Sequence, residues 1–145
     1  MKLLRLIGRI VLCFGISFVA LAIFGVVYFW FFVPDMCANE VISESSSPDG
    51  GKRLVVFQRD CGATTGFTTQ ASVLASNTPL PNKGGNLYVS DTNHGAAPNG
   101  PGGGPSLKVT WVSSQSVVLT HHPKVRVLKS EAEVDGVRAS YVTAE

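Results

Sequence analysis

Charge is missing from one long stretch of this chain. Residues 10–33 contain no Asp, Glu, Lys or Arg, which makes a run of about 24 uncharged, mostly apolar residues. At about 1.5 Å of rise per residue, a helix of this length crosses a bilayer core of roughly 30 Å. We therefore expect a transmembrane helix over residues 10–33, preceded by a basic segment over residues 1–9 and followed by a linker over residues 34–40.

The two flanks of this run differ in charge. Basic residues precede it, whereas acidic residues follow it as far as Lys52; they are Lys2, Arg5 and Arg9 on one side and Asp35, Glu40, Glu44 and Asp49 on the other. Because basic flanks stay in the cytoplasm, we expect a single pass of a bacterial inner membrane with the C-terminal domain periplasmic or extracellular. A cleaved signal peptide is the alternative, since Ala20-Leu21-Ala22 has the small-x-small form of a cleavage site.

Clustered charge and catalytic motifs are also scarce. Three of the 12 Lys and Arg residues precede the apolar run and one of the 10 Asp and Glu residues is Asp35, so nine of each sign remain from residue 38 onward. A neutral domain without basic clusters gives no support for nucleic-acid binding. There are no paired carboxylates, no Gly-x-Ser-x-Gly motif and no phosphate-binding loop, so we expect neither an enzyme nor a cofactor.

Histidines give little indication of a metal site. His121 and His122 are adjacent, so on a strand their side chains point to opposite faces and cannot hold one ion without help, for which His94 is the candidate. A strand end before Pro123 explains the pair more simply. We therefore expect no metal.

The chain has only three cysteines. Cys13 lies inside the apolar run, where it is a small apolar residue, and this leaves Cys37 and Cys61 in the exported part. In an oxidising compartment such a pair is normally bonded, and closing a loop of about 25 residues contributes roughly 3 kcal/mol. The sequence predicts a Cys37–Cys61 disulfide.

Short apolar segments separated by turn residues predict that the rest of the chain is all-β. The Ser47-Pro48-Asp49-Gly50 turn indicates a hairpin, and Asp135-Gly136 suits a tight turn between the last two strands. Leu107, Val109 and Trp111 alternate with Lys108, Thr110 and Val112, and this period of two makes Trp111 an expected core residue. We expect seven or eight short antiparallel strands forming a sandwich, meander or partly open barrel, at residues 41–45, 52–59, 68–75, 86–91, 107–112, 116–120, 125–129 and 137–142.

One long segment is too rich in Gly and Pro to form a strand. It covers residues 93–105 and includes Pro98, Pro101 and Pro105. We expect a flexible loop there, within a single extracytoplasmic β-domain over residues 41–145.

The segment Arg59-Asp60-Cys61-Gly62-Ala63-Thr64-Thr65-Gly66-Phe67 has the most unusual local chemistry. A cation, a carboxylate and two hydroxyls surround two glycines, so Arg59, Asp60, Thr64 and Thr65 are the candidates for contacting a ligand or partner. A tight loop closed by its own hydrogen bonds is the structural interpretation. With the Ser-Pro-Asp-Gly turn, this segment resembles a group of small bacterial membrane-anchored proteins with a β-rich exported domain of unassigned function. The resemblance implies the architecture alone.

Three hypotheses for function follow. In the first, the exported domain binds or supports another envelope component, with the lipid bilayer contacting residues 10–33 and a protein of the envelope as the partner. Alternatively, the chain is an immunity-type protein that blocks a toxin at the membrane. The third hypothesis is an enzyme that uses Cys61 as a nucleophile, although the sequence names no activating base nearby.

Overall fold

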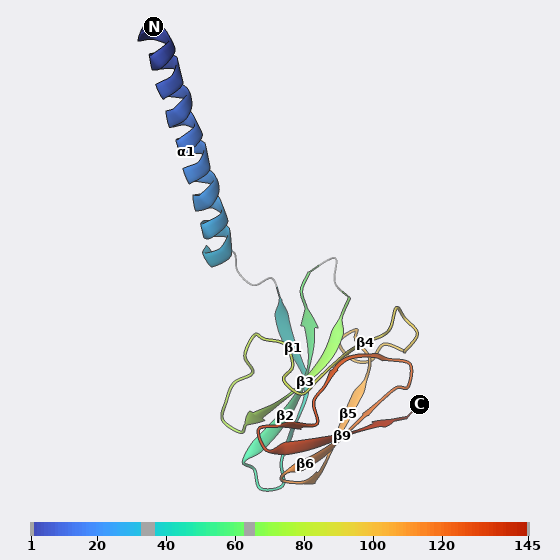
Figure 1. Cartoon of the computed structure of the whole chain (residues 1–145). Coiled ribbons are helices and arrows are strands. Elements are labelled where there is room, and N and C mark those ends of the chain that lie inside the picture. Colours follow the sequence, from blue (N-terminus) through green and yellow to red (C-terminus); the bar gives the residue numbers. More distant parts are fainter. Residues whose placement is uncertain (1, 33–36, 63–65, 145) are drawn as a thin grey trace. The chain divides into compact units, whose positions relative to one another are not determined.

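The chain forms two compact units, Met1–Asp35 and Met36–Glu145 (Figure 1). The computed structural model describes residues 2–32, 37–62 and 66–144. The first unit contains one helix, and the second is a β-sandwich.

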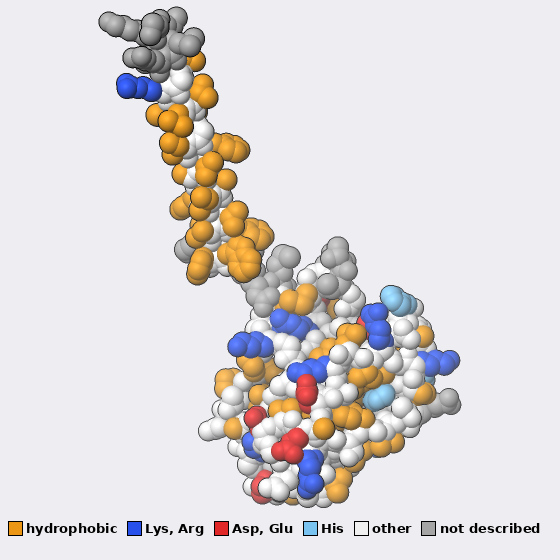
Figure 2. Space-filling view, viewed as in Figure 1, with side chains coloured by type: hydrophobic (Ala, Val, Ile, Leu, Met, Phe, Trp, Pro, Cys, Tyr) orange, Lys and Arg blue, Asp and Glu red, His pale blue; other side chains and the backbone are white. Residues whose placement is uncertain are grey.

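The helix α1 runs from Lys2 to Phe32. Its segment Ile7–Phe31 is long and apolar enough to cross a membrane, and hydrophobic side chains surround it (Figure 2). Trp30 and Phe31 are 81% and 79% exposed. A helix that is apolar on every side needs an apolar environment, so α1 could be a membrane anchor. Residues 33–36, where we expected the helix to end, lie outside the described residues.

Over residues 37–62 and 66–144, nine strands form the two sheets of the sandwich. The first sheet has the order β1 (Ala38–Ser46), β2 (Lys52–Asp60), β3 (Thr68–Ala75), β4 (Tyr88–Asp91) and β7 (Arg126–Ser130). The second has the order β5 (Leu107–Ser113), β6 (Ser116–His121), β9 (Val137–Thr143) and β8 (Glu133–Val134). The all-β prediction is confirmed, as two packed sheets that do not close into a barrel.

Two details of the predicted pairing were wrong. The Asp135-Gly136 turn exists, with φ values of 50° and 77°, but it joins β8 to β9, while β7 pairs with β4 in the other sheet. The chain crosses from β6 in the second sheet to β7 in the first sheet and then crosses back. Because of this crossover, β9 runs in the same direction as β6. The β6–β9 pair is therefore parallel, not antiparallel.

The hairpin predicted at Ser47-Pro48-Asp49-Gly50 connects β1 and β2. Ser47 Oγ donates to Asp49 Oδ1 over 2.6 Å, and the Gly51 N–H donates to the same oxygen over 3.1 Å. These two bonds hold the pKa of Asp49 below its usual value. Gly50 has a φ of 71°, which an L-residue rarely adopts, so the turn needs glycine at this position.

The hydrophobic core fills the space between the sheets. Tyr88 is fully buried and stacks on Tyr141 with ring centroids 5.7 Å apart. Trp111 is partly buried against the core, and its Nε1–H donates to the Ser45 carbonyl over 3.2 Å. The buried residues of this core come from both sheets. They are Leu54, Val56, Ala71, Val73, Leu87, Tyr88, Val117, Leu119 and Val137.

The first sheet is also covered on its outer face. Val55 and Phe57 point away from the core, opposite Leu54 and Val56, yet both are fully buried. Residues 76–87, which we name the strap, are hydrogen-bonded to side chains on that face. Arg53 Nη2, for example, donates to Thr78 O over 2.7 Å.

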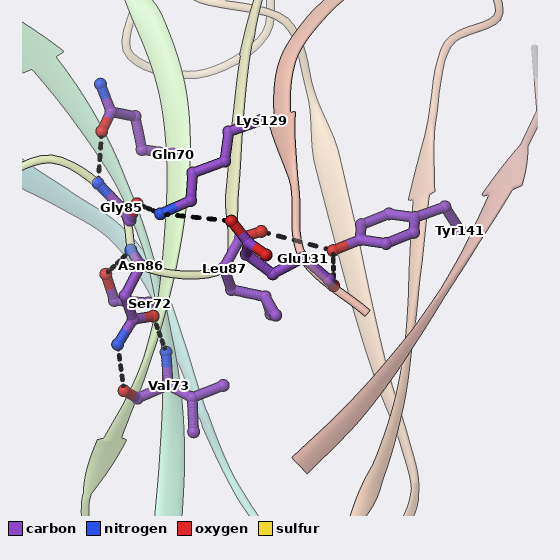
Figure 3. Close-up of polar contacts among 9 residues, drawn as sticks. All are labelled: Gln70, Ser72, Val73, Gly85, Asn86, Leu87, Lys129, Glu131 and Tyr141. Atoms are coloured by element: carbon purple, nitrogen blue, oxygen red, sulfur yellow. Dashed lines mark hydrogen bonds and ion pairs between the residues drawn. The ribbon is translucent and has the colours of Figure 1, made fainter. Parts of the chain in front are cut away.

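Asn86 fixes the end of the strap to β3 (Figure 3). Its Oδ1 accepts from Val73 N over 2.9 Å and its Nδ2 donates to Val73 O over 2.8 Å, so the side-chain amide replaces a neighbouring strand. Gly85 N donates to Gln70 Oε1 over 2.6 Å, and Lys129 Nζ donates to Gly85 O over 3.2 Å. The strap is therefore bonded to both β3 and β7.

Tyr141 should make stability depend on alkaline pH. Burial raises the pKa of its hydroxyl to about 12, assisted by Glu131 and Tyr88. Because an unfolded tyrosine has a pKa of about 10, this contribution to stability is complete below about pH 10 and is lost as the pH rises through about 12. Denaturant unfolding should show the wild type losing stability relative to Tyr141→Phe over this range. A stability difference that does not vary with pH would contradict the prediction.

The Gly/Pro-rich segment lies against the first sheet over part of its length. Gly104 and Pro105 are buried, and Thr69 Oγ1 donates to Pro105 O over 2.6 Å. A Cβ at Gly104 would lie 2.5 Å from Thr69 Oγ1 and 2.9 Å from Thr69 N. Glycine is therefore needed for this close approach. The flexibility that we expected over residues 93–105 stays a prediction.

Replacing Gly104 should destabilise the domain. Gly104→Ala places a methyl group against backbone that cannot retreat easily, and we expect a loss of about 1–3 kcal/mol in the free energy of unfolding. Gly66→Ala is the matched control, because no described atom outside its chain neighbours lies within 4 Å of its added Cβ. Thermal or denaturant unfolding of both variants checks this, and equal stabilities would show that the contact is not tight.

Candidate functional site at the disulfide end of the domain

Strand register brings the candidate residues to one end of the sandwich, which we call the disulfide end. The pairs at this end are Ala38 with Asp60, Arg59 with Thr68, Thr69 with Ser90, Asp91 with Arg126, and Leu107 with His121. Residues up to 35 positions apart in the sequence, such as Asp91 and Arg126, thus become direct neighbours. The opposite end, which carries the β1–β2 hairpin and the β8–β9 turn, is the far end.

A disulfide joins Cys37 to Cys61, as the sequence predicted. It links the residue before β1 to the residue after β2 and closes the end of that hairpin. The Cys61 sulfur is bonded, so in this oxidised form it is not a nucleophile. Asp60 Oδ1 accepts from Gly62 N over 2.9 Å, and Gly62 has a φ of 104°. The Asp60 side chain therefore holds the backbone of Gly62 directly after β2.

Arg59 binds the strap to the first two strands. Its Nη1 donates to Asn39 Oδ1 over 2.7 Å and to Asn82 Oδ1 over 3.0 Å. The amide group of Asn39 then donates to the Pro81 and Lys83 carbonyls over 2.9 and 2.8 Å. We call Arg59, Asn39 and Asn82 the Arg59 cluster. Asn82 Nδ2 donates to Cys37 O over 2.8 Å, which connects this cluster to the disulfide.

Sequence reasoning found part of this cluster and missed the rest. Arg59 and Asp60 lie beside Cys61 as expected, whereas Thr64 and Thr65 lie outside the described residues. The proposed ligand contacts of these four residues therefore stay a prediction. Asn39 and Asn82 were missed, because no local pattern relates either residue to Arg59.

The histidines lie at the same end but in different settings. His121 stacks on Tyr88 with centroids 5.7 Å apart, and its Nδ1–H donates to the His122 carbonyl over 3.1 Å. His122 Nδ1 accepts from Lys124 N over 3.2 Å, so its other ring nitrogen is the donor in the neutral form. Within residues 2–32, 37–62 and 66–144, no three His, Cys, Asp or Glu side chains gather as metal ligands would.

Asp91 and Arg126 form an ion pair at the edge of the first sheet. Arg126 Nε donates to both carboxylate oxygens over 3.0 and 3.2 Å, and Nη2 donates to one of them. Arg126 holds the pKa of Asp91 below its usual value, and Asn93 N donates a further bond over 2.8 Å. The pair fastens the turn that follows β4 to the start of β7.

A shallow hollow of about 480 Å³ opens at the same end of the domain, around the last residues of β6. Lys108, Thr120 and His122 line it, with Ser106 and His121 contributing polar atoms and Pro98 and Ala144 closing the rim. Lys108 and Thr120 are direct cross-strand partners on one face of the second sheet. The described lining of the hollow therefore offers hydrogen-bond donors and one cation, Lys108.

Charge is unequally divided between the two ends. Among the described residues, register and hydrogen bonding place five cations and three carboxylates at the disulfide end, namely Arg59, Lys83, Lys108, Lys124 and Arg126 against Glu40, Asp60 and Asp91. The far end has three described cations and four described carboxylates, namely Lys52, Arg53 and Arg138 against Glu44, Asp49, Glu133 and Asp135, while Lys129 and Glu131 lie between the two ends. The balanced total in the sequence conceals this separation. The three histidines add further hydrogen-bond donors to the disulfide end.

Comparison with known proteins yields one match. No curated protein and no solved structure matches the chain. A family model described as "Family of unknown function (DUF5412)" matches residues 5–99, about two-thirds of the chain, which include most of α1, the first four strands and the strap. This agrees with the expected resemblance to an uncharacterised group. The chain belongs to DUF5412, a family of unknown function.

Proposed function

We propose that the protein is a single-pass membrane protein of a bacterial envelope whose extracytoplasmic β-domain binds or supports another envelope component. The observation that carries this proposal is the Cys37–Cys61 disulfide in a domain that directly follows an apolar helix. Disulfides persist in oxidising compartments and are rare in the reducing cytoplasm. An apolar helix of sufficient length supplies both the route across the membrane and the anchor.

The orientation follows from charge on the helix flanks. Lys2, Arg5 and Arg9 precede the span, and basic residues near a first span remain in the cytoplasm. We propose that residues 1–9 are cytoplasmic, that residues 10–33 cross the inner membrane, and that the β-domain lies in the periplasm or outside the cell.

A rigid domain end supports a binding role. The disulfide, the Arg59 cluster and the Asp91–Arg126 pair hold separate segments in fixed positions at one end. Rigid presentation of exposed polar groups reduces the entropy lost on binding a partner. The disulfide end is therefore the surface that we propose for the partner.

Reporter fusions test the topology. Alkaline phosphatase fused after Glu145 should be active, and a fluorescent protein that folds only in the cytoplasm should be dark at the same position. Changing Lys2, Arg5 and Arg9 to Glu should lower the exported fraction. A cytoplasmic C-terminus in the wild type would refute the proposal, and a mature N-terminus at Ile23 would show that the helix is a cleaved signal peptide.

Site-specific photocrosslinking in cells tests the binding role. A crosslinker at Gly66, which has open space around it at the disulfide end, should give one discrete protein adduct. The matched position is Val112, which is 66% exposed near the far end of β5 and should give none. An immunity-type role predicts an adduct only when a toxin is present. Equal adducts at both positions, or none in any condition, would contradict a specific partner at this end.

A further inference from the structure

β9 is longer than the strand beside it at the edge of the second sheet. β8 pairs only with the first two residues of β9, whereas β6 pairs with β9 as far as Thr143, at the disulfide end. On the β8 side, Ala139 N donates to Ala132 O over 2.9 Å, and the described residues make no backbone bond to β9 beyond it. Residues 140–143 therefore form an edge without a neighbouring described strand, which we call the free edge.

Backbone groups of the free edge point away from β6. Alternate residues of a strand direct their N–H and C=O groups to the same side, so Tyr141 and Thr143 direct theirs as Ala139 does. Ala144 N, of the opposite parity, donates to His121 O of β6 over 3.0 Å. Among the described residues, the outward N–H and C=O groups of Tyr141 and Thr143 have no partner. Such a row of groups is a template for another extended chain.

The same corner of the sandwich leaves an inward-facing side chain uncovered. Val127 of β7 pairs with Ser90, which follows the core residue Tyr88 by two positions and is 1% exposed. Paired residues point to the same face, so Val127 also faces the space between the sheets, yet it is 39% exposed. Tyr88 of β4 stacks on Tyr141 of β9. The next strand, β7, therefore lies over the place that a longer β8 would fill.

We propose that an extended segment of the partner polypeptide adds to the free edge of β9 and completes the second sheet at the disulfide end. Its backbone pairs with Tyr141 and Thr143, and an inward-facing apolar side chain covers Val127. An outward-facing apolar side chain lies beside Val142, which is 48% exposed. The occupant is a polypeptide, because N–H donors and C=O acceptors at strand spacing match another extended backbone. This inference rests on the proposed binding role and names the chemistry of the partner.

A designed extension of the full chain in detergent tests whether the free edge accepts a strand. Asn-Gly-Thr-Thr-Val-Val-Val is added after Glu145, so that a two-residue turn returns the new segment along β9. Hydrogen exchange at the Tyr141 and Thr143 amides should slow by about tenfold or more, since each amide gains a partner. The matched extension Asn-Gly-Thr-Thr-Pro-Val-Pro lacks the backbone donors opposite these residues and should not slow exchange. Equal exchange in the two extended chains would overturn the proposal.

Photocrosslinking in cells tests whether the partner uses this edge. A crosslinker at Val142 should give the same discrete adduct as one at Gly66, and the pairing extension should lower both yields by about tenfold or more, because a tethered strand competes at high effective concentration. The proline extension should leave both yields unchanged. The matched position is Val112 on β5, the opposite edge of the same sheet, which should give no adduct. Adducts that persist at full yield with the pairing extension would refute strand addition.

A charge at Val127 tests the inward contact. Val127→Asp places a carboxylate where the added strand would bury it, so the Val142 adduct should fall by about tenfold. Val41→Asp is the matched control, because Val41 is 46% exposed on β1, at the opposite edge of the first sheet. Hydrogen exchange of the core amides shows whether each variant keeps the fold. Equal adduct yields from the two folded variants would contradict insertion beside Val127.

Three outcomes separate this inference from the binding role on which it rests. The absence of an adduct at both Gly66 and Val142 in every condition would refute the binding role itself. An adduct at Gly66 alone would keep a partner at the disulfide end and refute strand addition. An adduct at Val142 that joins two copies of the chain would show that a second copy occupies the free edge, and it would overturn the assignment to a separate partner.

Discussion

Removing the Cys37–Cys61 disulfide should lower the free energy of unfolding of the domain by about 2–4 kcal/mol. The bond closes a loop with a sequence separation of 24 residues, so breaking it gives the unfolded chain more conformations. It also fixes Cys37, whose carbonyl accepts from Asn82 of the strap. Denaturant unfolding of the full chain in detergent, for Cys37→Ser with Cys61→Ser, measures the loss.

Cysteine controls make this result specific. Reducing the wild type should produce the same loss as the double variant and should not affect the double variant further. Cys13→Ser should have little effect, because Cys13 is a free thiol exposed on α1. Unchanged stability after reduction would mean that the bond does not stabilise the fold. A reduced chain that gains a thiol-dependent reaction would favour the Cys61 enzyme hypothesis.

Phe57→Ala should cost about 3–5 kcal/mol, the cost typical of removing a fully buried aromatic ring. Phe57 is 0% exposed although it lies on the outer face of the first sheet. The strap is bonded across this face by Arg53, Arg59 and Gln70, so it cannot collapse freely into the space left by the ring. Thermal and denaturant unfolding measure the cost.

Phe67→Ala is the matched control for the same chemical change. Phe67 is 45% exposed, so its removal should cost much less than that of Phe57. Similar losses at both positions would mean that the strap does not bury the outer face. In that case, hydrogen exchange should find the strap amides as fast as those of exposed turns.

Local patterns in the sequence predicted the local structure. The Ser47-Pro48-Asp49-Gly50 turn and the alternation over β5 were both confirmed, since each depends on neighbouring residues. The strap was missed, because it has no periodicity and its bonds reach β1, β2 and β3 over 13 to 45 residues. The parallel β6–β9 pair was also missed. It depends on β7 belonging to the other sheet, which no local pattern in the sequence indicates.

The candidate site was predictable only in part. The two cysteines outside the apolar helix could be paired by counting, and Arg59 and Asp60 are sequence neighbours of Cys61. The asparagines that bind Arg59 could not be found, because many exposed asparagines have no such role. The separation of charge between the two ends depends on strand register, which the sequence did not specify.

Thiol counting in intact cells tests the central claim, an exported and oxidised β-domain, most directly. Cells are quenched in acid, and denatured protein is alkylated with a maleimide carrying a polymer that shifts its mobility. The account predicts one adduct per chain, at Cys13, without reductant, and three adducts after reduction. Three adducts without reductant would show that Cys37 and Cys61 are reduced in the cell, which would contradict an oxidised, exported domain.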